Sequence, residues 1–363
     1  MISSATKPVP RHILTYAESW RGGGVERAQL RLARGWIAVG CRVTLIIGDG
    51  NGPLASEVPP GVEIVALGRR GLVRLMVALP GMVRLMRPDV IFCPGNHYTG
   101  VAFWLRLRLG RVCPPIVVKV SNALKRPDQS RAMALAYRWW LRLHPYFIAH
   151  VVAMSPAMAD EVTAAMRIPR ERIAVIANPP AMPITGAALP TLPAGRFLLG
   201  VGRLVAQKRW DRLIAALPLL AEPDIALVIL GEGDARAALT TQIMTLGLTR
   251  RVTLPGHAAD PLPAIARAAA VVLVSDFEGV PGVLREALAL GTPVVTTDSS
   301  VAVREIVTGA ELGTIVTAGD EPALIAALEY WLSPGRARPV PVPEPGGRAA
   351  EEYIAVFESV ASV

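Results

Sequence analysis

The sequence predicts an α/β protein with two Rossmann-like domains, each a parallel sheet wrapped in helices. Apolar runs of strand length alternate with segments of helical periodicity. This rhythm stops in a stretch rich in Pro, Gly and Ala (178–195) and restarts at residue 197. Strands that are apolar throughout are typical of parallel sheets covered on both faces. Because 363 residues exceed one small core, we expect one domain over 1–185 and a second over 186–345.

The elements follow in order in each half. The strands expected in the first half are HILTYA (12–17), CRVTLIIG (41–48), VEIVAL (62–67), VIFCPG (90–95) and IVVKVS (116–121), with helical patterns over 28–40 and 72–86. The second half repeats the scheme with FLLGVGRL (197–204), IALVILGEG (225–233), RVTLPG (251–256), VVLVSD (271–276) and TPVVTTD (292–298), and helices begin near Asp211 and Pro281. A Pro-rich stretch (333–347) precedes the last helix, 349–360. Ligands of such sheets bind at the carboxyl ends of the strands, so the expected site lies between the two domains.

The net charge of +9 is divided unevenly. Residues 1–190 hold 24 Lys/Arg and 10 Asp/Glu, whereas residues 191–363 hold 14 and 19. In the first half, basic residues alternate with apolar and aromatic ones over 72–87, 103–111 and 137–146. This pattern favours contact with an anionic membrane surface, although ordinary helices whose arginines reach into water would look the same. No nucleic-acid motif accompanies the charge, and we expect no nucleic-acid partner.

The cysteines and the first residues of the sequence indicate the cellular compartment. Residues 1–12 contain no apolar segment of the kind that a secretory signal needs, and no apolar run approaches the ~20 residues that span a bilayer. Cys41, Cys93 and Cys113 lack metal-ligand spacing, so each is expected to be a reduced, buried residue. These features predict a cytoplasmic protein, peripheral on the inner face of the cell membrane.

The most informative feature is a pair of glutamates, Glu278 and Glu286, in SDFEGVPGVLREALALGTPVVTTD (275–298). Fully helical spacing would place them about 12 Å apart, the reach from a hexose across a diphosphate to a ribose. The helix that starts between them offers free N–H groups to a diphosphate. Paired carboxylates could instead serve a hydrolase as acid and base. The basic residues described next favour a phosphorylated donor.

A second cluster follows the first strand of the second half. In GRLVAQKRWD (202–211), Arg203 and Lys208 can both neutralise the charge that grows on a departing diphosphate, whereas Arg209 is expected to be solvated. The chain contains no Asp-x-Asp, the usual Mg²⁺ or Mn²⁺ holder in sugar transfer. We therefore expect Arg203 and Lys208 to stabilise the departing diphosphate without a metal or another cofactor.

Two constellations in the first half complete the prediction. The glycines of RGGGVE (21–26) permit close backbone approach to a ligand, but they do not match the dinucleotide fingerprint, so NAD is disfavoured. Polar residues follow two strands in CPGNHYTG (93–100) and KVSNALKRPD (119–128). The expected acceptor-binding residues are Asn96, His97, Ser121, Asn122, Lys125 and Arg126.

Together, GGGVE (22–26), GRLVAQKR (202–209), LVILGEGDAR (227–236), VTLPGH (252–257) and the glutamate block resemble the large retaining glycosyltransferase family 4. The resemblance implies the GT-B fold, with the nucleotide sugar on the C-terminal domain, the acceptor on the N-terminal one, and a final helix (346–363) crossing back to the N-terminal domain. It places Arg203 and Lys208 at the diphosphate, Glu278 beside the transferred sugar and Glu286 at the ribose. Further donor contacts implied by the family are Gly23, Gly24, Gly279, Gly282, Val283 and Leu284.

One position departs from the family pattern. Many members carry a His at the end of the fifth strand of the first domain, where this chain has Ser121 or Asn122. Because a retaining enzyme can let the leaving phosphate take the acceptor proton, transfer needs no protein base.

The expected function is retaining transfer of a hexose from a UDP- or GDP-sugar to a lipid-linked or saccharide acceptor, in polysaccharide or glycolipid synthesis. Glu278, Arg203 and Lys208 are the expected catalytic residues. A soluble disaccharide synthase or phosphorylase, a sugar-nucleotide epimerase and a non-catalytic binding protein on the same fold are the alternatives.

Overall fold

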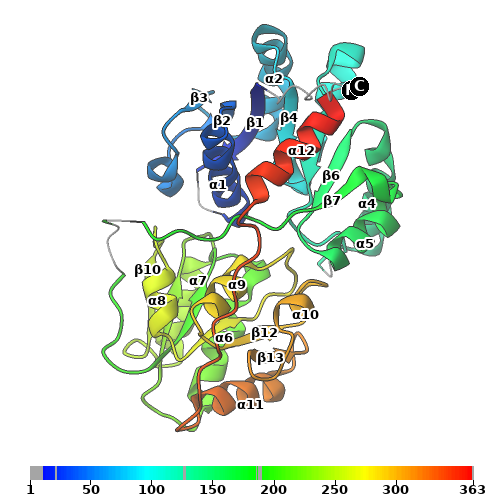
Figure 1. The fold of residues 1–363 in the computed structure, drawn as a ribbon. Helices are drawn as coiled ribbons and strands as arrows, with labels where there is room; N and C mark the ends of the chain where they lie inside the picture. Colours follow the sequence, from blue (N-terminus) through cyan, green and yellow to red (C-terminus); the bar gives the residue numbers. More distant parts are fainter. Residues whose placement is uncertain (1–10, 21–22, 126–127, 185, 187–189, 362–363) are drawn as a thin grey trace, which may run out of the picture. The chain divides into compact units, whose positions relative to one another are not determined.

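The computed structural model describes residues 11–20, 23–125, 128–184, 186 and 190–361. The chain divides into two compact units. The N-terminal unit comprises Met1–Pro179 and Pro345–Val363, and the C-terminal unit comprises Pro180–Glu344. Each unit holds one parallel sheet with helices packed around it (Figure 1), as the alternating apolar runs predicted. The prediction of two Rossmann-like sheets is thus confirmed.

In the described residues, the sheet of the N-terminal unit has seven strands in the order β3-β2-β1-β4-β5-β6-β7. The strands are β1 (His12–Ser19), β2 (Arg42–Asp49), β3 (Val62–Ala66), β4 (Val90–Cys93), β5 (Ile116–Lys119), β6 (His150–Ala153) and β7 (Ile173–Val175). The helices of this unit are α1 (Gly24–Ala38), α2 (Leu72–Met86), α3 (Thr99–Leu109), α4 (Arg131–Leu143), α5 (Pro156–Met166) and α12 (Ala349–Ala361).

The sheet of the C-terminal unit has the order β10-β9-β8-β11-β12-β13. Its strands are β8 (Phe197–Val201), β9 (Ala226–Leu230), β10 (Val252–Gly256), β11 (Ala270–Leu273), β12 (Val294–Thr297) and β13 (Gly313–Val316). Its helices are α6 (Trp210–Ala216), α7 (Arg236–Thr245), α8 (Leu262–Arg267), α9 (Gly282–Ala289), α10 (Val303–Ile306) and α11 (Glu321–Leu332). A short 3-10 turn, Ala206–Lys208, comes directly before α6.

The strand order places a switch point in each sheet. The chain moves outward on one side of β1 and then on the other, and it does the same about β8. Loops on either side of such a reversal leave the carboxyl ends of adjacent strands in opposite directions, which opens a crevice for a ligand. Candidate sites are therefore expected after β1 and β4 in one unit and after β8 and β11 in the other.

The last helix, α12, belongs to the core of the N-terminal unit. Figure 1 shows it alongside α1. Gly35 permits this approach, because a Cβ there would lie 2.5 Å from the Cβ of Ala350. Trp36, Phe92 and Phe357 meet edge to face beneath the two helices, with ring centroids 5.1–6.3 Å apart. Burial of such large aromatic surfaces is a strong attachment for a terminal helix.

Within the described residues, no helix combines the length and apolar character needed to cross a bilayer. All three cysteines are buried thiols, as expected.

Candidate functional site

The C-terminal switch point brings together Lys208 and Glu278. Lys208 ends the turn after β8, and Glu278 lies in the loop that connects β11 to α9. The Lys208 Nζ lies 2.6 Å from the Glu278 Oε1, and the two side chains are only 14% and 12% exposed. Since the surrounding protein excludes most of the solvent, water screens their attraction less than it would at the surface.

Backbone hydrogen bonds fix the two loops that carry this pair. The Asp276 N–H donates to the Gln207 carbonyl at 2.9 Å, and the Gln207 side-chain amide donates to the Phe277 carbonyl at 2.7 Å. Next to β12, the Glu278 N–H donates to the Ser299 carbonyl at 2.8 Å. The two residues before Glu278 and the Glu278 backbone itself are thus anchored, which restricts where its carboxylate can lie.

Arg203 lies one turn earlier, in the loop directly after β8. Its side chain is exposed, and its carbonyl accepts a 3.0 Å hydrogen bond from the Trp210 indole. Two glycines in the loop after β9 allow that loop to lie close to the loop that carries Arg203. A Cβ on Gly231 would lie 1.9 Å from the Gly202 carbonyl oxygen, and one on Gly233 would lie 2.3 Å from that of Leu204. The GEGD segment (231–234) therefore packs directly against the loop that carries Arg203.

The helix between the two predicted glutamates begins where the sequence indicated. Pro281 is the N-cap of α9, and Gly282 is its first residue and is exposed. Val283 is half-buried, whereas the Leu284 side chain lies fully in the core, so only its backbone can face a ligand. Glu286 is half-buried in the second turn of the helix. Glu278 precedes the helix, so the two glutamates do not follow helical spacing.

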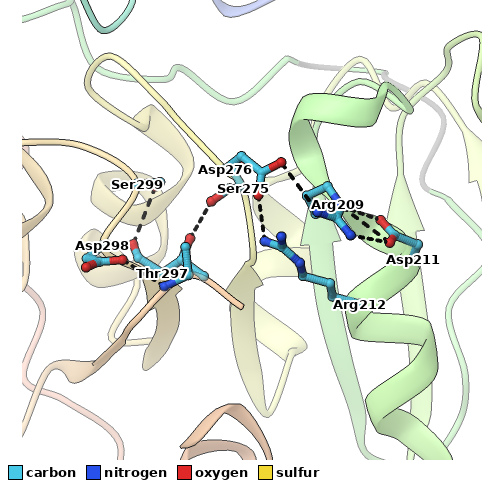
Figure 2. Close-up of polar contacts among 9 residues, drawn as sticks. Arg209, Asp211, Arg212, Ser275, Asp276, Thr297, Asp298 and Ser299 are labelled. Carbon is cyan, nitrogen blue, oxygen red and sulfur yellow. Dashed lines mark hydrogen bonds and ion pairs between the residues drawn. The ribbon is translucent and has the colours of Figure 1, made fainter. Parts of the chain in front are cut away.

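Arg209 is not the solvated side chain that the sequence suggested. It is half-buried, and its guanidinium contacts Asp211 at 2.8 Å and Asp276 at 3.5 Å (Figure 2). Arg212, in the first turn of α6, pairs with the other carboxylate oxygen of Asp276 at 2.7 Å. The arginine next to Lys208 thus contacts a residue close to Glu278, an arrangement that the sequence did not indicate.

In the N-terminal unit, the early glycines start α1 beside the end of β4. Gly23 is the N-cap and Gly24 the first helical residue. In the first turn, Glu26 accepts a 3.3 Å hydrogen bond from the Tyr98 hydroxyl, which itself accepts one at 2.9 Å from the Glu18 N–H. Both switch-point loops of this unit are therefore connected through Tyr98.

Three of the predicted acceptor residues meet at the ends of β4 and β5. The Asn96 side chain accepts hydrogen bonds from the Ser121 N–H at 3.3 Å and hydroxyl at 3.2 Å, and it donates to the Asn122 carbonyl at 3.3 Å. His97 is exposed, and its ring lies against Tyr98 at a centroid distance of 3.9 Å. Lys125 is exposed, and Arg126 lies outside the described residues.

Lys119 is a buried cation near this group that sequence reasoning missed. It ends β5 with 1% exposure, and its Nζ donates to the Asn178 side chain at 3.2 Å. Burial lowers the pKa of the Lys119 ammonium to about 8, although the negative charge of Glu26 opposes this. The signal was visible as a single lysine in the apolar run IVVKVS.

The surface of α4 combines arginines with uncovered apolar side chains. Its exposed or partly exposed arginines are Arg131, Arg138 and Arg142, and its large exposed apolar residues are Met133, Leu135, Trp139 and Leu143. Trp139 is 60% exposed, and the Arg142 guanidinium lies 5.2 Å from the centroid of its ring. We call this set the α4 face.

Metal ligands do not cluster in the part of the chain that is described: it contains no group of three or more His, Cys, Asp or Glu side chains placed to hold an ion.

Comparison with known proteins identifies the class. Residues 195–333 match the family model described as glycosyl transferases group 1, and residues 23–179 match that of the glycosyl transferase 4-like domain. Among solved structures, Anabaena HepE in complex with UDP-glucose superposes with a TM-score of 0.70 at 20% identity, covering 97% of this chain and 98% of that one. The lipopolysaccharide glycosyltransferase WaaG superposes with a TM-score of 0.67 at 16% identity, covering 97% and 95%. These likenesses show the GT-B fold.

The two matched segments carry the motifs of both units, and the chain belongs to glycosyltransferase family 4, the group 1 glycosyltransferases. Among curated proteins, the lipopolysaccharide core glycosyltransferase LpsE of Rhizobium meliloti is 27% identical over 75% of this chain and 84% of its own length. An N-acetylgalactosaminyltransferase of Campylobacter jejuni, which acts on a diphospho-undecaprenol-linked sugar by its name, is 35% identical. That match spans only 39% of each chain.

Proposed function

We propose that the protein is a retaining glycosyltransferase that moves a hexose from a UDP- or GDP-sugar to a hydroxyl of a lipid-linked or saccharide acceptor. The observation that carries the proposal is the Lys208–Glu278 pair at the C-terminal switch point, where an open parallel sheet binds its ligand. A cation and a carboxylate side by side match a donor whose phosphate needs positive charge and whose sugar needs hydrogen-bond acceptors.

The cationic groups act on the leaving diphosphate. Lys208 and Arg203 supply positive charge, and the first N–H groups of α9 add the partial charge of a helix N-terminus. As the bond between the anomeric carbon and the phosphate oxygen breaks, negative charge grows on that oxygen, and these groups stabilise it. We propose that this charge stabilisation makes a divalent cation unnecessary.

Glu278 acts on the sugar and Glu286 on the ribose. The Glu278 carboxylate accepts hydrogen bonds from sugar hydroxyls and stabilises positive charge at the anomeric carbon. The acceptor oxygen bonds to that carbon on the face that the phosphate leaves, and its proton passes to the departing phosphate oxygen. The anomeric configuration is then retained, and no histidine is needed at the position of Ser121.

The acceptor is assigned to the N-terminal unit. Asn96, Ser121 and Asn122 form a hydrogen-bonded polar group at its strand ends, and His97 and Lys125 add exposed polar groups. Sugar hydroxyls are recognised by such amide and hydroxyl groups. The names of the C. jejuni and R. meliloti relatives, a diphospho-undecaprenol-linked sugar and a lipopolysaccharide core, favour a lipid-linked saccharide.

The α4 face is assigned to an anionic membrane surface, which would place the protein at the cytoplasmic face of the cell membrane. Helix α4 carries three arginines and no acidic residue, so its charge complements an anionic bilayer. Trp139 beside Arg142 is the combination that anchors helices at the headgroup level.

Membrane contact is tested by sedimentation with vesicles. Binding is expected to phosphatidylglycerol-containing vesicles and not to pure phosphatidylcholine, to weaken with salt, and to fall in Trp139→Gln. Met244→Gln in the C-terminal unit, which also removes a large exposed apolar side chain, is the matched control. Equal binding to both kinds of vesicle would remove this assignment.

The reaction is tested with the full chain, UDP- and GDP-hexoses, and undecaprenyl-diphosphate-linked or free saccharide acceptors, with products followed by mass spectrometry and the new linkage assigned by NMR. We expect an α-linked product from an α-linked donor, activity that survives chelators, and loss of transfer in Lys208→Met. An inverted linkage would refute retention. Epimerised donor without transfer would indicate an epimerase, and phosphorolysis of free disaccharide would indicate a phosphorylase.

A further inference from the structure

A group of charged side chains adjoins the Lys208–Glu278 pair and is used by no step of the proposed reaction. Asp276 precedes Glu278 by two residues, and Arg209 follows Lys208 directly. Asp276 contacts Arg212 at 2.7 Å through one oxygen and Arg209 at 3.5 Å through the other. The Asp276 backbone N–H also donates to the Gln207 carbonyl at 2.9 Å. One residue of the β11–α9 loop therefore contacts three positions around the start of α6.

The backbone of Arg209 has a conformation that a residue with a Cβ rarely adopts. Its φ of +50° lies in the left-handed region, which is unfavourable for a residue that carries a Cβ. Glycine would adopt this conformation without that cost. The arginine that stands there donates from Nε to Asp211 at 3.0 Å, from Nη2 to Asp211 at 2.8 Å and from Nη1 to Asp276. The guanidinium thus bridges its own helix start and the opposite loop.

The other side of the loop is also held. The Thr297 hydroxyl at the end of β12 donates to the Ser275 carbonyl at 2.7 Å, which fixes the residue before Asp276 (Figure 2). The residue before Asp276 is thus held by β12, and the Asp276 side chain contacts Arg212 of α6. Glu278 lies between this contact and its own anchor at Ser299.

We propose that Asp276 is a positioning residue: by binding Arg209 and Arg212, it sets the separation of Lys208 and Glu278. This role rests on the proposed function, because the separation matters only where both side chains meet one substrate. A displacement of 1 Å between reacting groups can lower a rate by about 100-fold. The contact joins the two loops that carry the reacting groups, beside the hydrogen bonds from Asp276 N–H to the Gln207 carbonyl and from the Gln207 side chain to the Phe277 carbonyl. Its loss loosens the spacing of the loops, while these two bonds keep the unit folded.

The test uses Asp276→Asn and Arg209→Gly in the full chain. Arg209→Gly removes the guanidinium but suits the left-handed backbone, so we expect its unfolding midpoint to stay at or above that of the wild type. In both variants kcat is expected to fall roughly 10- to 100-fold, while KM for the donor changes less than about threefold. Glu222→Gln, which breaks the Arg196–Glu222 pair (2.9 Å) beside the first residue of β8, is the control and should keep wild-type kcat.

Hydrogen exchange of the peptide containing 275–279 gives a readout that does not depend on turnover. We expect faster exchange there in both variants and unchanged exchange in Glu222→Gln. Wild-type exchange and kcat in Arg209→Gly and Asp276→Asn would overturn the proposal. If the wild type transfers no sugar, the proposed function fails, and wild-type exchange in the variants would still refute the loop contact. Should Asp276→Asn fail to fold, Arg209→Gly decides alone.

Discussion

Lys208 and Glu278, 70 residues apart in the chain, are bonded to each other at 2.6 Å, although the proposed reaction assigns them to different parts of the donor. In that reaction, the Lys208 ammonium binds phosphate and the Glu278 carboxylate binds sugar hydroxyls. Donor binding must therefore exchange a protein–protein ion pair for two protein–ligand contacts. In the proposed reaction, the strength of the Lys208–Glu278 pair would lower the affinity of the site for a nucleoside diphosphate.

Glu278→Gln is expected to bind free UDP or GDP more tightly than the wild type while losing transfer. The substitution removes the negative charge that neutralises Lys208, so more of the ammonium charge acts on phosphate. Lys208→Gln should weaken the binding of the same nucleotide. Isothermal titration with both nucleotides measures the two effects, and Glu222→Gln serves as the charge-matched control. Unchanged nucleotide affinity in Glu278→Gln would show that the carboxylate does not compete with phosphate.

Gly231→Ala is expected to destabilise the C-terminal unit and to weaken donor binding together. Its φ of +153° disfavours other residues, and the new Cβ would lie 1.9 Å from the Gly202 carbonyl oxygen. Either the β9 loop or the loop carrying Arg203 must move, at a cost of typically 1–3 kcal/mol. Urea unfolding and nucleotide titration measure the two effects. Gly195→Ala, where a Cβ meets nothing within 4 Å, is the control. A fully stable Gly231→Ala would contradict this account of the GEGD segment.

Ten of the thirteen strands in the described residues were readable from the sequence, because strands buried on both faces must be apolar throughout, whereas β6, β7 and β13 were missed. The position of α9 was readable because Pro is frequent at the start of a helix, and Pro281 is the N-cap of α9. Arg209 was misjudged although its closest ion partner, Asp211, is only two residues away. Its second partner, Asp276, lies 67 residues away, and nothing local signals a left-handed arginine. Lys119 shows the same limit, since its partner Asn178 is 59 residues distant. Pairings over such separations depend on the sheet order, which periodicity does not give.

Phe357→Ala is expected to cost the N-terminal unit about 3–5 kcal/mol of unfolding free energy. The Phe357 ring is fully buried and contacts Trp36, Phe92 and Tyr353, so its removal leaves a cavity between α12 and the sheet. Urea unfolding followed by tryptophan fluorescence measures the loss. Ser359→Ala, on the exposed side of the same helix, should leave the midpoint unchanged. Equal midpoints for the two variants would mean that α12 contributes little to this core.

His144 is expected to make the N-terminal unit acid-sensitive. Its Nδ1 contacts the Trp140 carbonyl at 2.9 Å, which requires the proton on that nitrogen, while the buried Nε2 has no hydrogen-bond partner among the described residues. Burial lowers the pKa of this imidazole to about 4, from an ordinary value of 6.5. Between these values the unfolded chain binds a proton that the folded chain does not.

Stability must therefore fall as the pH drops from 6.5 to 4, by at most about 3 kcal/mol, since each pKa unit is worth about 1.4 kcal/mol. The replacement His144→Asn keeps a donor for the Trp140 carbonyl but cannot titrate. The unfolding midpoints of His144→Asn are measured from pH 4 to pH 8. At the acid end they should equal or exceed those of the wild type. Over the whole range they should change less with pH than those of the wild type. Identical slopes for the two proteins would assign the acid sensitivity to other groups. His150 is the next candidate, because burial and the nearby Arg172 also lower its pKa.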